Sequence, residues 1–299
     1  MILTSLLGWA VVALSSSFLR QAPDYDSPLE TQLLMGAVVE TLDTQRYWVK
    51  VQSDDYTGWV TEMGLKPLDE GQKDAYIASS KWICAEVLTR VRVEPDESSA
   101  PVCDLGMGDL VRQTGLSQGP WTLVLLPDDR SGWVPSSALK DFRSWAEESC
   151  ALLENPSACA ASVCSLACSF IGTPYMWGGN TSKYFDCSGL VEFCFLMNGV
   201  LLPRNASQQA RCGVPVEDGA YEPGDLLFFG SSNPLKVTHV GIYLGDGRMV
   251  HSSQVVRINV LESYGREVVA ASRILGNIDS GKGAVSILRS PYYFDQNGD

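Results

Sequence analysis

The chain has 299 residues, of which 45% are hydrophobic and 19% charged, so it is globular material with room for two or three domains. Its formal net charge of −13 argues against nucleic acid as a partner, because nucleic-acid binding needs basic patches. The charge does not exclude small peptide substrates.

The N-terminal stretch, residues 1–14, is apolar enough to suggest an export signal. Its first basic residue, however, is Arg20, so the usual cationic start of a signal peptide is missing. The stretch is also too short and too mixed to span a membrane, and we predict no stable membrane insertion. We interpret Trp9–Leu19 as a first β-strand, with a short export signal before it left open.

The N-terminal half contains one internal repeat. Leu19–Asp24 resembles Val91–Asp96, and Gly58–Val60 resembles Gly132–Val134. In each copy a strand with aromatic residues precedes the Gly-Trp-Val sequence, and a polar turn separates the two. Short strands broken by Pro, Gly and Asp turns predict two small antiparallel β-barrels.

The C-terminal half reads as helices followed by strands. Residues 142–155 are polar and helical in pattern, and a second helix over Ser157–Ile171 ends at Gly172 and Pro174. A third helix follows Cys187. The predicted strands are Asp225–Phe229, Thr238–Leu244, Arg248–His251, Val255–Val260 and Val268–Ile274. This order is typical of an α+β domain.

Of the nine cysteines, Cys187 has the neighbours that suggest chemistry. The sequence Asp186-Cys187-Ser188 comes directly before the third helix, so Cys187 lies at a helix N-terminus. There the helix dipole and the free N–H groups favour a thiolate and offer part of an oxyanion hole. The alternative is a buried, inert cysteine, and the polar neighbours favour the catalytic interpretation.

The chain has only two histidines, His239 and His251, and both follow Cys187. His239 lies in an apolar strand, where it is either a core histidine or a general base, and Gly241 leaves space on the same face. His251 ends the next strand, after the hairpin turn Gly245–Gly247, which brings the imidazoles within reach of each other. A cysteine nucleophile needs such a base.

Three other cysteines, Cys159, Cys164 and Cys168, are close in sequence but have no histidine beside them. We interpret them as helix packing rather than as a metal site. No metal and no cofactor is expected.

Five motifs in this order resemble the NlpC family of papain-like peptidases. They are Gly172–Gly179, Asp186–Leu190, Pro223–Leu226, His239–Gly245 and His251, and the resemblance covers about residues 157–275. It implies a papain-like NlpC catalytic domain, with helices packed on an antiparallel sheet. It also implies Cys187 as nucleophile, His239 as base, His251 as third polar residue and Tyr175 as an aid to the oxyanion hole.

The two repeats resemble bacterial SH3-like domains, so we predict domains at 1–69, 70–142 and 143–299. The whole arrangement resembles the γ-D-glutamyl-L-diamino acid endopeptidases. Their first SH3-like domain caps the cleft, and their pocket holds the free amino group of an N-terminal L-alanine. The implied substrate is therefore a murein peptide, L-Ala-γ-D-Glu-diamino acid.

By the same resemblance, five residues bind the substrate. Asp186 and Ser188 flank the amine, Trp177 and Ser207 line the site, and Tyr56 is the capping tyrosine. An acidic partner expected near residues 20–23 is not found there, because Gln21 and Ala22 are uncharged.

Other functions stay open. One is a papain-like amidase or a general peptidoglycan hydrolase, and another is a wall-binding protein with weak catalytic activity. The expected location is the bacterial cell envelope, periplasmic or secreted. A cytoplasmic location also stays open, because a clear signal peptide is missing.

Overall fold

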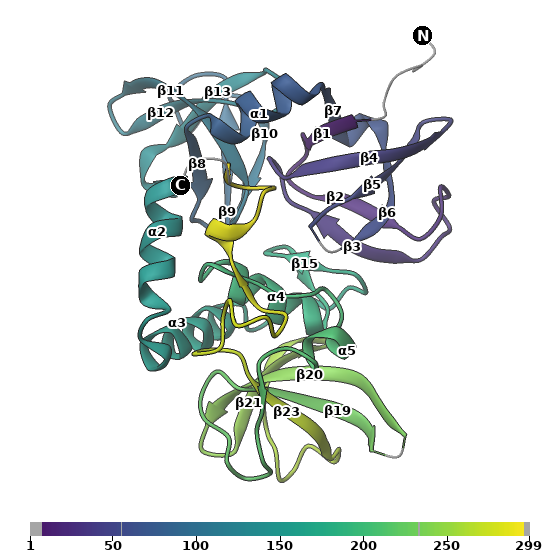
Figure 1. Ribbon diagram of the computed structural model, residues 1–299. Helices are drawn as coiled ribbons and strands as arrows, with labels where there is room; N and C mark the ends of the chain where they lie inside the picture. The colour runs from purple at the N-terminus through teal and green to yellow at the C-terminus, as the bar shows by residue number, and fades with distance from the viewer. Residues whose placement is uncertain (1–7, 55, 233, 296–299) are drawn as a thin grey trace. The chain divides into compact units, whose positions relative to one another are not determined.

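The computed structural model describes residues 8–54, 56–232 and 234–295, and it divides into two compact units (Figure 1). The first unit contains residues 8–145 and 290–295, and the second contains residues 146–289. Each unit is described by itself below. Among the described residues, no helix is both long and apolar enough to cross a membrane.

The first unit contains two seven-stranded antiparallel sheets. The first consists of β1 (Gly8–Val12), β2 (Ser17–Arg20), β3 (Leu29–Leu33), β4 (Val38–Gln45), β5 (Trp48–Gln52), β6 (Thr57–Thr61) and β7 (Leu65–Leu68). The second consists of β8 (Lys81–Cys84), β9 (Leu88–Arg92), β10 (Pro101–Gly106), β11 (Leu110–Gln118), β12 (Trp121–Leu125), β13 (Ser131–Pro135) and β14 (Leu139–Asp141). Their strand orders are β3-β2-β6-β5-β4-β1-β7 and β10-β9-β13-β12-β11-β8-β14. Each strand of one sheet thus has a counterpart at the same place in the other, as the sequence repeat predicts.

The repeated Arg-x-x-Pro sequence forms the same turn in both sheets. Arg20 Nη1 donates to the carbonyl oxygen of Ser27 at 2.6 Å, and Arg92 Nη1 donates to that of Ser99 at 2.7 Å. The arginine of each repeat therefore closes the loop that joins its strand to the next one.

The glycine of each Gly-Trp-Val sequence lies against the strand that carries this arginine. A Cβ atom on Gly58 would lie 1.9 Å from Leu19 Cδ2 and 2.8 Å from the carbonyl oxygen of Arg20. A Cβ atom on Gly132 would lie 2.5 Å from Val91 Cγ1. The two motifs of the repeat recur together because they pack on each other.

The predicted first strand, Trp9–Leu19, is wrong as a single element. The chain forms β1 and β2 there, with a bend between them, and the two strands pair with different neighbours. The bend comes at residues 14–16, where Ser16 Oγ accepts a hydrogen bond from Gln32 Nε2 at 2.6 Å.

A helix between the two sheets, α1 (Glu70–Ala78), was not anticipated from the sequence. Its N-cap is Asp69, whose Oδ1 accepts a hydrogen bond from the backbone N–H of Gln72 at 2.8 Å. Gln72 Oε1 accepts from the backbone N–H of Asp69 at 2.9 Å. This reciprocal capping box was visible in the sequence as Asp-x-x-Gln.

The second unit has helices first and a sheet afterwards, so the predicted α+β order is confirmed. The helices are α2 (Phe142–Leu152), which begins in the first unit, α3 (Pro156–Ser169), α4 (Cys187–Leu196) and α5 (Ala206–Gln209). The main antiparallel sheet has the order β18-β23-β19-β20-β21-β22. Its strands are β18 (Val214–Pro215), β19 (Leu226–Ser232), β20 (Leu235–Gly245), β21 (Arg248–Ser253), β22 (Val255–Val260) and β23 (Val268–Arg273). Helices α3 and α4 pack on each other and against β20 and β21 (Figure 1).

We expect Gly58→Ala to lower the free energy of unfolding of the first unit by about 1–3 kcal/mol, because the added methyl group overpacks a filled contact. Gly71→Ala is the matched control. A Cβ atom there meets only Asp69 Oδ1, at 3.5 Å, and alanine favours the helix α1. Urea denaturation of both variants measures the difference. Equal stability of the two variants would contradict the packing explanation.

Candidate active site

Cys187 is the first residue of α4, and Asp186 is the N-cap that starts the helix there. Asp186 Oδ1 accepts a hydrogen bond from the backbone N–H of Gly189 at 2.7 Å. The backbone N–H groups of Ser188 and Val240 lie close enough to the Cys187 sulfur to lower the pKa of its thiol. Since Val240 follows His239 on β20, the sulfur lies next to the strand that carries His239.

Two glycine-containing motifs hold the start of α4 in place. The backbone N–H of Gly178 donates to Asp186 Oδ2 at 2.9 Å, and the backbone N–H of Asp186 donates to the carbonyl oxygen of Gly179 at 2.8 Å. A Cβ atom on Gly189 would lie only 1.9 Å from that carbonyl oxygen. The close approach of the two backbones explains why glycine occupies these positions.

The two histidines come from neighbouring strands of the sheet, β20 and β21, joined by the hairpin that the sequence predicts. His239 Nε2 lies 2.7 Å from His251 Nδ1, and the two rings are nearly perpendicular, at 84°. Gly241 makes this possible, because a Cβ atom there would lie 3.2 Å from the Cβ of His251. This hydrogen bond leaves Nδ1 of His239 for the cysteine.

A residue of the next strand extends the pair. Asn259, on β22, has its Oδ1 2.8 Å from His251 Nε2. Tyr264 packs against both imidazoles, with ring centroids 6.3 Å from His239 and 5.1 Å from His251. The sequence analysis included neither residue.

Burial keeps both histidines neutral. It is the main reason that the pKa of His239 falls to about 3, and the neighbouring His251, Arg266 and Arg257 lower this pKa further. Burial also lowers the pKa of His251, against an opposing hydrogen bond to Asn259.

Cys187 is shifted the other way. Burial raises the pKa of its thiol to about 11, and the neighbouring carboxylate of Asp186 adds to the rise. The backbone N–H groups of Val240 and Ser188 and the charge of Arg204 lower this pKa by less. The N–H groups at the helix start favour the thiolate, as expected, but burial opposes it by more. Burial thus favours the thiol form of Cys187 and the neutral form of His239.

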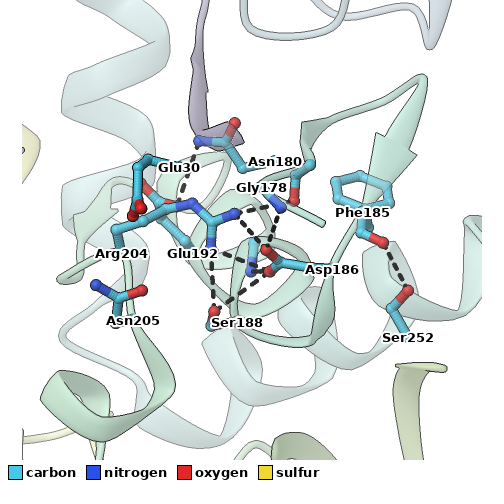
Figure 2. Close-up of polar contacts among 12 residues, drawn as sticks. Glu30, Gly178, Asn180, Phe185, Asp186, Ser188, Glu192, Arg204, Asn205 and Ser252 are labelled. Atoms are coloured by element: carbon cyan, nitrogen blue, oxygen red, sulfur yellow. Dashed lines mark hydrogen bonds and ion pairs between the residues drawn. The ribbon is translucent and has the colours of Figure 1, made fainter. Parts of the chain in front are cut away.

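An ion cluster surrounds Asp186, the residue that precedes the nucleophile in the chain (Figure 2). Arg204, only 1% exposed, donates from Nη1 to Asp186 Oδ1 at 3.0 Å and from Nη2 to Asp186 Oδ2 at 2.5 Å. Its Nη1 also donates to Ser188 Oγ at 3.0 Å, and its Nε lies 3.6 Å from Glu192 Oε2. One guanidinium thus contacts two carboxylates in this cluster.

The cluster bears on the predicted role of Asp186 in binding the substrate amine. Its two oxygens already accept hydrogen bonds from Arg204, Gly178, Gly189 and Ser188. A carboxylate has about four lone-pair positions, so these donors fill them. An ammonium group would have to displace one of them, and the role of Asp186 in amine binding stays a prediction.

The other predicted site residues of the second unit differ in their surroundings. Tyr175 lies close enough to Cys187 and Asp186 for their charges to add to a rise in its pKa, to about 12, that is mainly caused by burial. Trp177 is 67% exposed, and Ser207 is an exposed residue of α5. The roles predicted for these residues stay predictions.

Tyr56 belongs to the first unit, where it has an acidic partner that the sequence analysis missed. Its hydroxyl donates to one carboxylate oxygen of Glu30, and Gln21 Nε2 donates to the other. Glu30 is distant from Gln21 in sequence but close in space, because β2 and β3 pair with each other. The pairing of these two strands was the signal that would have found it.

Comparisons with known proteins follow the same division of the chain. Residues 172–273 match the NlpC/P60 family, and residues 19–65 match the bacterial dipeptidyl-peptidase Sh3 domain. Over 241 residues the chain is 30% identical to the gamma-D-glutamyl-L-lysine dipeptidyl-peptidase of Bacillus cereus. This match covers 77% of the chain and 68% of that protein. The chain belongs to the NlpC/P60 family. This is a family of cysteine peptidases, so the family predicted from the five motifs is confirmed.

Two further relatives cover nearly the whole chain. Dipeptidyl-peptidase 6 of Lysinibacillus sphaericus is 27% identical over 285 residues, 90% of this chain and 99% of that protein. The crystal structure of an NlpC/P60 family protein from Bacillus cereus covers 90% of this chain and all of that one, with a TM-score of 0.74 and 23% identity. This last likeness supports the fold alone. The Sh3 match covers the first repeat, and a second SH3-like domain stays a prediction that rests on the shared strand order.

We expect alkylation of Cys187 by iodoacetamide to become about tenfold faster with each pH unit through the neutral range, because the thiolate fraction grows as the pH rises toward the raised pKa of the thiol. Mass spectrometry of the Cys187 peptide gives the rate, with Cys187→Ser as the control for assignment. A thiolate–imidazolium pair would instead give an alkylation rate that hardly changes with pH.

The lowered pKa of His239 predicts how hydrolysis depends on pH. The imidazole stays neutral at pH values below 6.5, the ordinary pKa of histidine, so hydrolysis should be lost only at a pH lower than that.

The two histidines should differ in their effect on turnover. We expect His239→Ala to lower the rate roughly 10²–10⁴-fold or more, because the thiol then loses its base. His251→Asn should keep part of the activity, and His251→Ala should lose most of it, because a third residue orients the base rather than exchanging the proton. Steady-state kinetics with one peptide substrate ranks the three variants. Equal losses in His239→Ala and His251→Asn would contradict the ranking.

Proposed function

We propose that this protein is a cysteine endopeptidase that hydrolyses the bond between γ-D-glutamate and a diamino acid in murein peptides with a free N-terminal L-alanine. The observation that carries the proposal is the hydrogen-bonded pair His239–His251 beside the buried thiol of Cys187. Two relatives named gamma-D-glutamyl-L-lysine dipeptidyl-peptidase, from Bacillus cereus and Bacillus subtilis, support the choice of bond.

In the proposed mechanism, Nδ1 of His239 takes the proton of the Cys187 thiol as the sulfur attacks the carbonyl carbon of γ-D-glutamate. The negative charge that develops on the carbonyl oxygen is stabilised by the backbone N–H of Cys187 and the hydroxyl of Tyr175. The C–N bond then breaks, and His239 returns its proton to the amine that leaves. Water, deprotonated by His239, hydrolyses the thioester and restores the thiol.

The neutral resting pair suits this order of events. Thiol and imidazole carry no charge until the substrate arrives, so the site avoids the cost of burying an ion pair. The charge separation occurs together with the attack, when oxyanion and imidazolium form in the same step. His251 then stabilises the imidazolium of His239 by accepting a hydrogen bond from its Nε2.

The net charge of the cluster beside Cys187 supports recognition of an amine. Asp186 and Glu192 carry two negative charges against the one positive charge of Arg204. An ammonium group, such as that of an N-terminal L-alanine, would be attracted to these two carboxylates. Tyr56 lies in the other unit of the chain, and its part in binding stays a prediction.

Cleavage should therefore depend on a free amine. We expect L-Ala-γ-D-Glu-L-Lys and its diaminopimelate counterpart to be cut, and their N-acetyl derivatives to be cut on the order of 10⁴-fold more slowly, because a blocked amine leaves buried polar groups unpaired. Mass spectrometry of the products identifies the bond. Rapid cleavage of the N-acetyl peptides or of intact sacculi would instead favour a general peptidoglycan hydrolase.

A charge variant separates amine recognition from a general loss of activity. Glu192→Gln removes one negative charge from the cluster while keeping a similar shape, so KM for the free-amine peptide should rise and the rate for the N-acetyl peptide should not change. Glu154→Gln, at an exposed position, is the matched control. If Glu192→Gln changes the kinetics of both substrates equally, the cluster does not recognise the amine.

A further inference from the structure

The hydrogen bonds of the two histidines continue to a third side chain. Asn259 Oδ1 lies 2.8 Å from His251 Nε2, and His251 Nδ1 lies 2.7 Å from His239 Nε2. Three strands thus contribute to one chain of contacts, because β20, β21 and β22 are neighbours in the sheet. Only the far nitrogen of His239, Nδ1, lies outside this chain of contacts, and it is the nitrogen left for the thiol.

The direction of these hydrogen bonds follows from the chemistry of the amide. A carbonyl oxygen accepts and never donates, so His251 Nε2 carries a proton and donates it to Asn259 Oδ1. A neutral imidazole has one proton, so His251 Nδ1 is an acceptor and His239 Nε2 is the donor. His239 then has its single proton on Nε2, and its Nδ1 holds a lone pair.

The opposite orientation of the amide would reverse every step. If the NH₂ group of Asn259 faced His251, Nε2 of His251 would accept and its Nδ1 would carry the proton. His239 Nε2 would then accept, and its Nδ1 would be protonated. A protonated Nδ1 cannot take a proton from the thiol, so one amide decides whether the base is in its working tautomer.

We propose that Asn259 is a positioning residue that holds both histidines in the Nε2–H tautomer and so leaves the lone pair of His239 Nδ1 for Cys187. The inference rests on the cysteine–histidine chemistry proposed above and adds a residue to it. Asn259 acts through His251 and does not touch the substrate.

The surroundings explain why an amide, rather than a carboxylate, suits this position. Burial is the main cause that lowers the pKa of His251, and Arg257 and Arg266 lower it further, against the hydrogen bond to Asn259. A neutral amide acceptor favours the imidazolium less than a charged carboxylate would. Tyr264, packed edge-on against His251, limits the ring's freedom to turn away from the amide.

The tautomers can be observed without any substrate. His239 and His251 are the only histidines of the chain, so the imidazole nitrogen spectrum of untagged protein labelled with ¹⁵N-histidine contains only these two rings. At neutral pH we expect both rings as Nε2–H tautomers in the wild type. In Asn259→Leu, we expect a mixture with the Nδ1–H form for at least one ring. A wild-type spectrum with either ring in the Nδ1–H form would overturn the proposal.

Kinetics then test the consequence for catalysis. We expect Asn259→Leu to lower kcat on the order of 10- to 100-fold with little change in KM, by analogy with other partners that orient an imidazole. Asn259→Asp keeps an oxygen acceptor and should recover most of this loss. Asn277→Leu, the same substitution at a partly buried position of the same unit, is the control for stability and should keep full activity.

The results separate this proposal from the proposed function. If murein peptides are not cleaved at all, the proposed function fails, while the wild-type tautomers still decide the role of Asn259. If peptides are cleaved and Asn259→Leu keeps both the wild-type tautomers and the wild-type kcat, the role of Asn259 fails and the function stands.

Discussion

The arrangement around the nucleophile depends on one buried carboxylate, that of Asp186. It caps the first turn of α4, which fixes the position of Cys187. It also accepts a hydrogen bond from the backbone N–H of Gly178, in the motif that precedes the helix. A buried carboxylate is tolerated only when it is paired, and Arg204 supplies the pair from a segment later in the chain. The start of α4, the Gly178–Gly179 backbone and the segment that leads into α5 are thus joined through a single side chain.

The second constraint is the burial of the two histidines. His239 is 6% exposed and His251 is fully buried. Burial opposes charge on the thiol and on the imidazoles alike, and it outweighs the helix N-terminus that favours a thiolate. The same burial strengthens the hydrogen bonds that run from His239 to Asn259, because a low dielectric strengthens electrostatic contacts. Orientation, rather than charge, therefore prepares the base.

Much of this architecture follows from local patterns in the sequence. The helix that begins at Cys187 was predicted from apolar spacing, and the contact of His239 with His251 from two strands joined by a Gly-Asp-Gly turn. The internal repeat gave the two matching sheets. These features depend on residues near one another in the chain, where propensity and periodicity act.

The features that were missed depend on contacts between distant segments. Asn259 meets His251 only because β22 pairs with β21 in a register that places Asn259 opposite Met249. Arg204 has no periodic pattern that marks it as buried, and Glu30 reaches Tyr56 through strand pairing. The sequence also did not show that burial raises the pKa of Cys187, because the position at a helix start does not reveal how deeply the sulfur is buried.

The raised pKa of the Cys187 thiol has a consequence for the lifetime of the enzyme. Peroxides and disulfides react with thiolates far faster than with thiols, so a nucleophile that stays protonated at rest is a poor target for them. The catalytic sulfur is then open to oxidation mainly during the brief interval in which His239 holds its proton. Resistance to oxidation at rest and reactivity toward a bound substrate are thereby compatible in one atom.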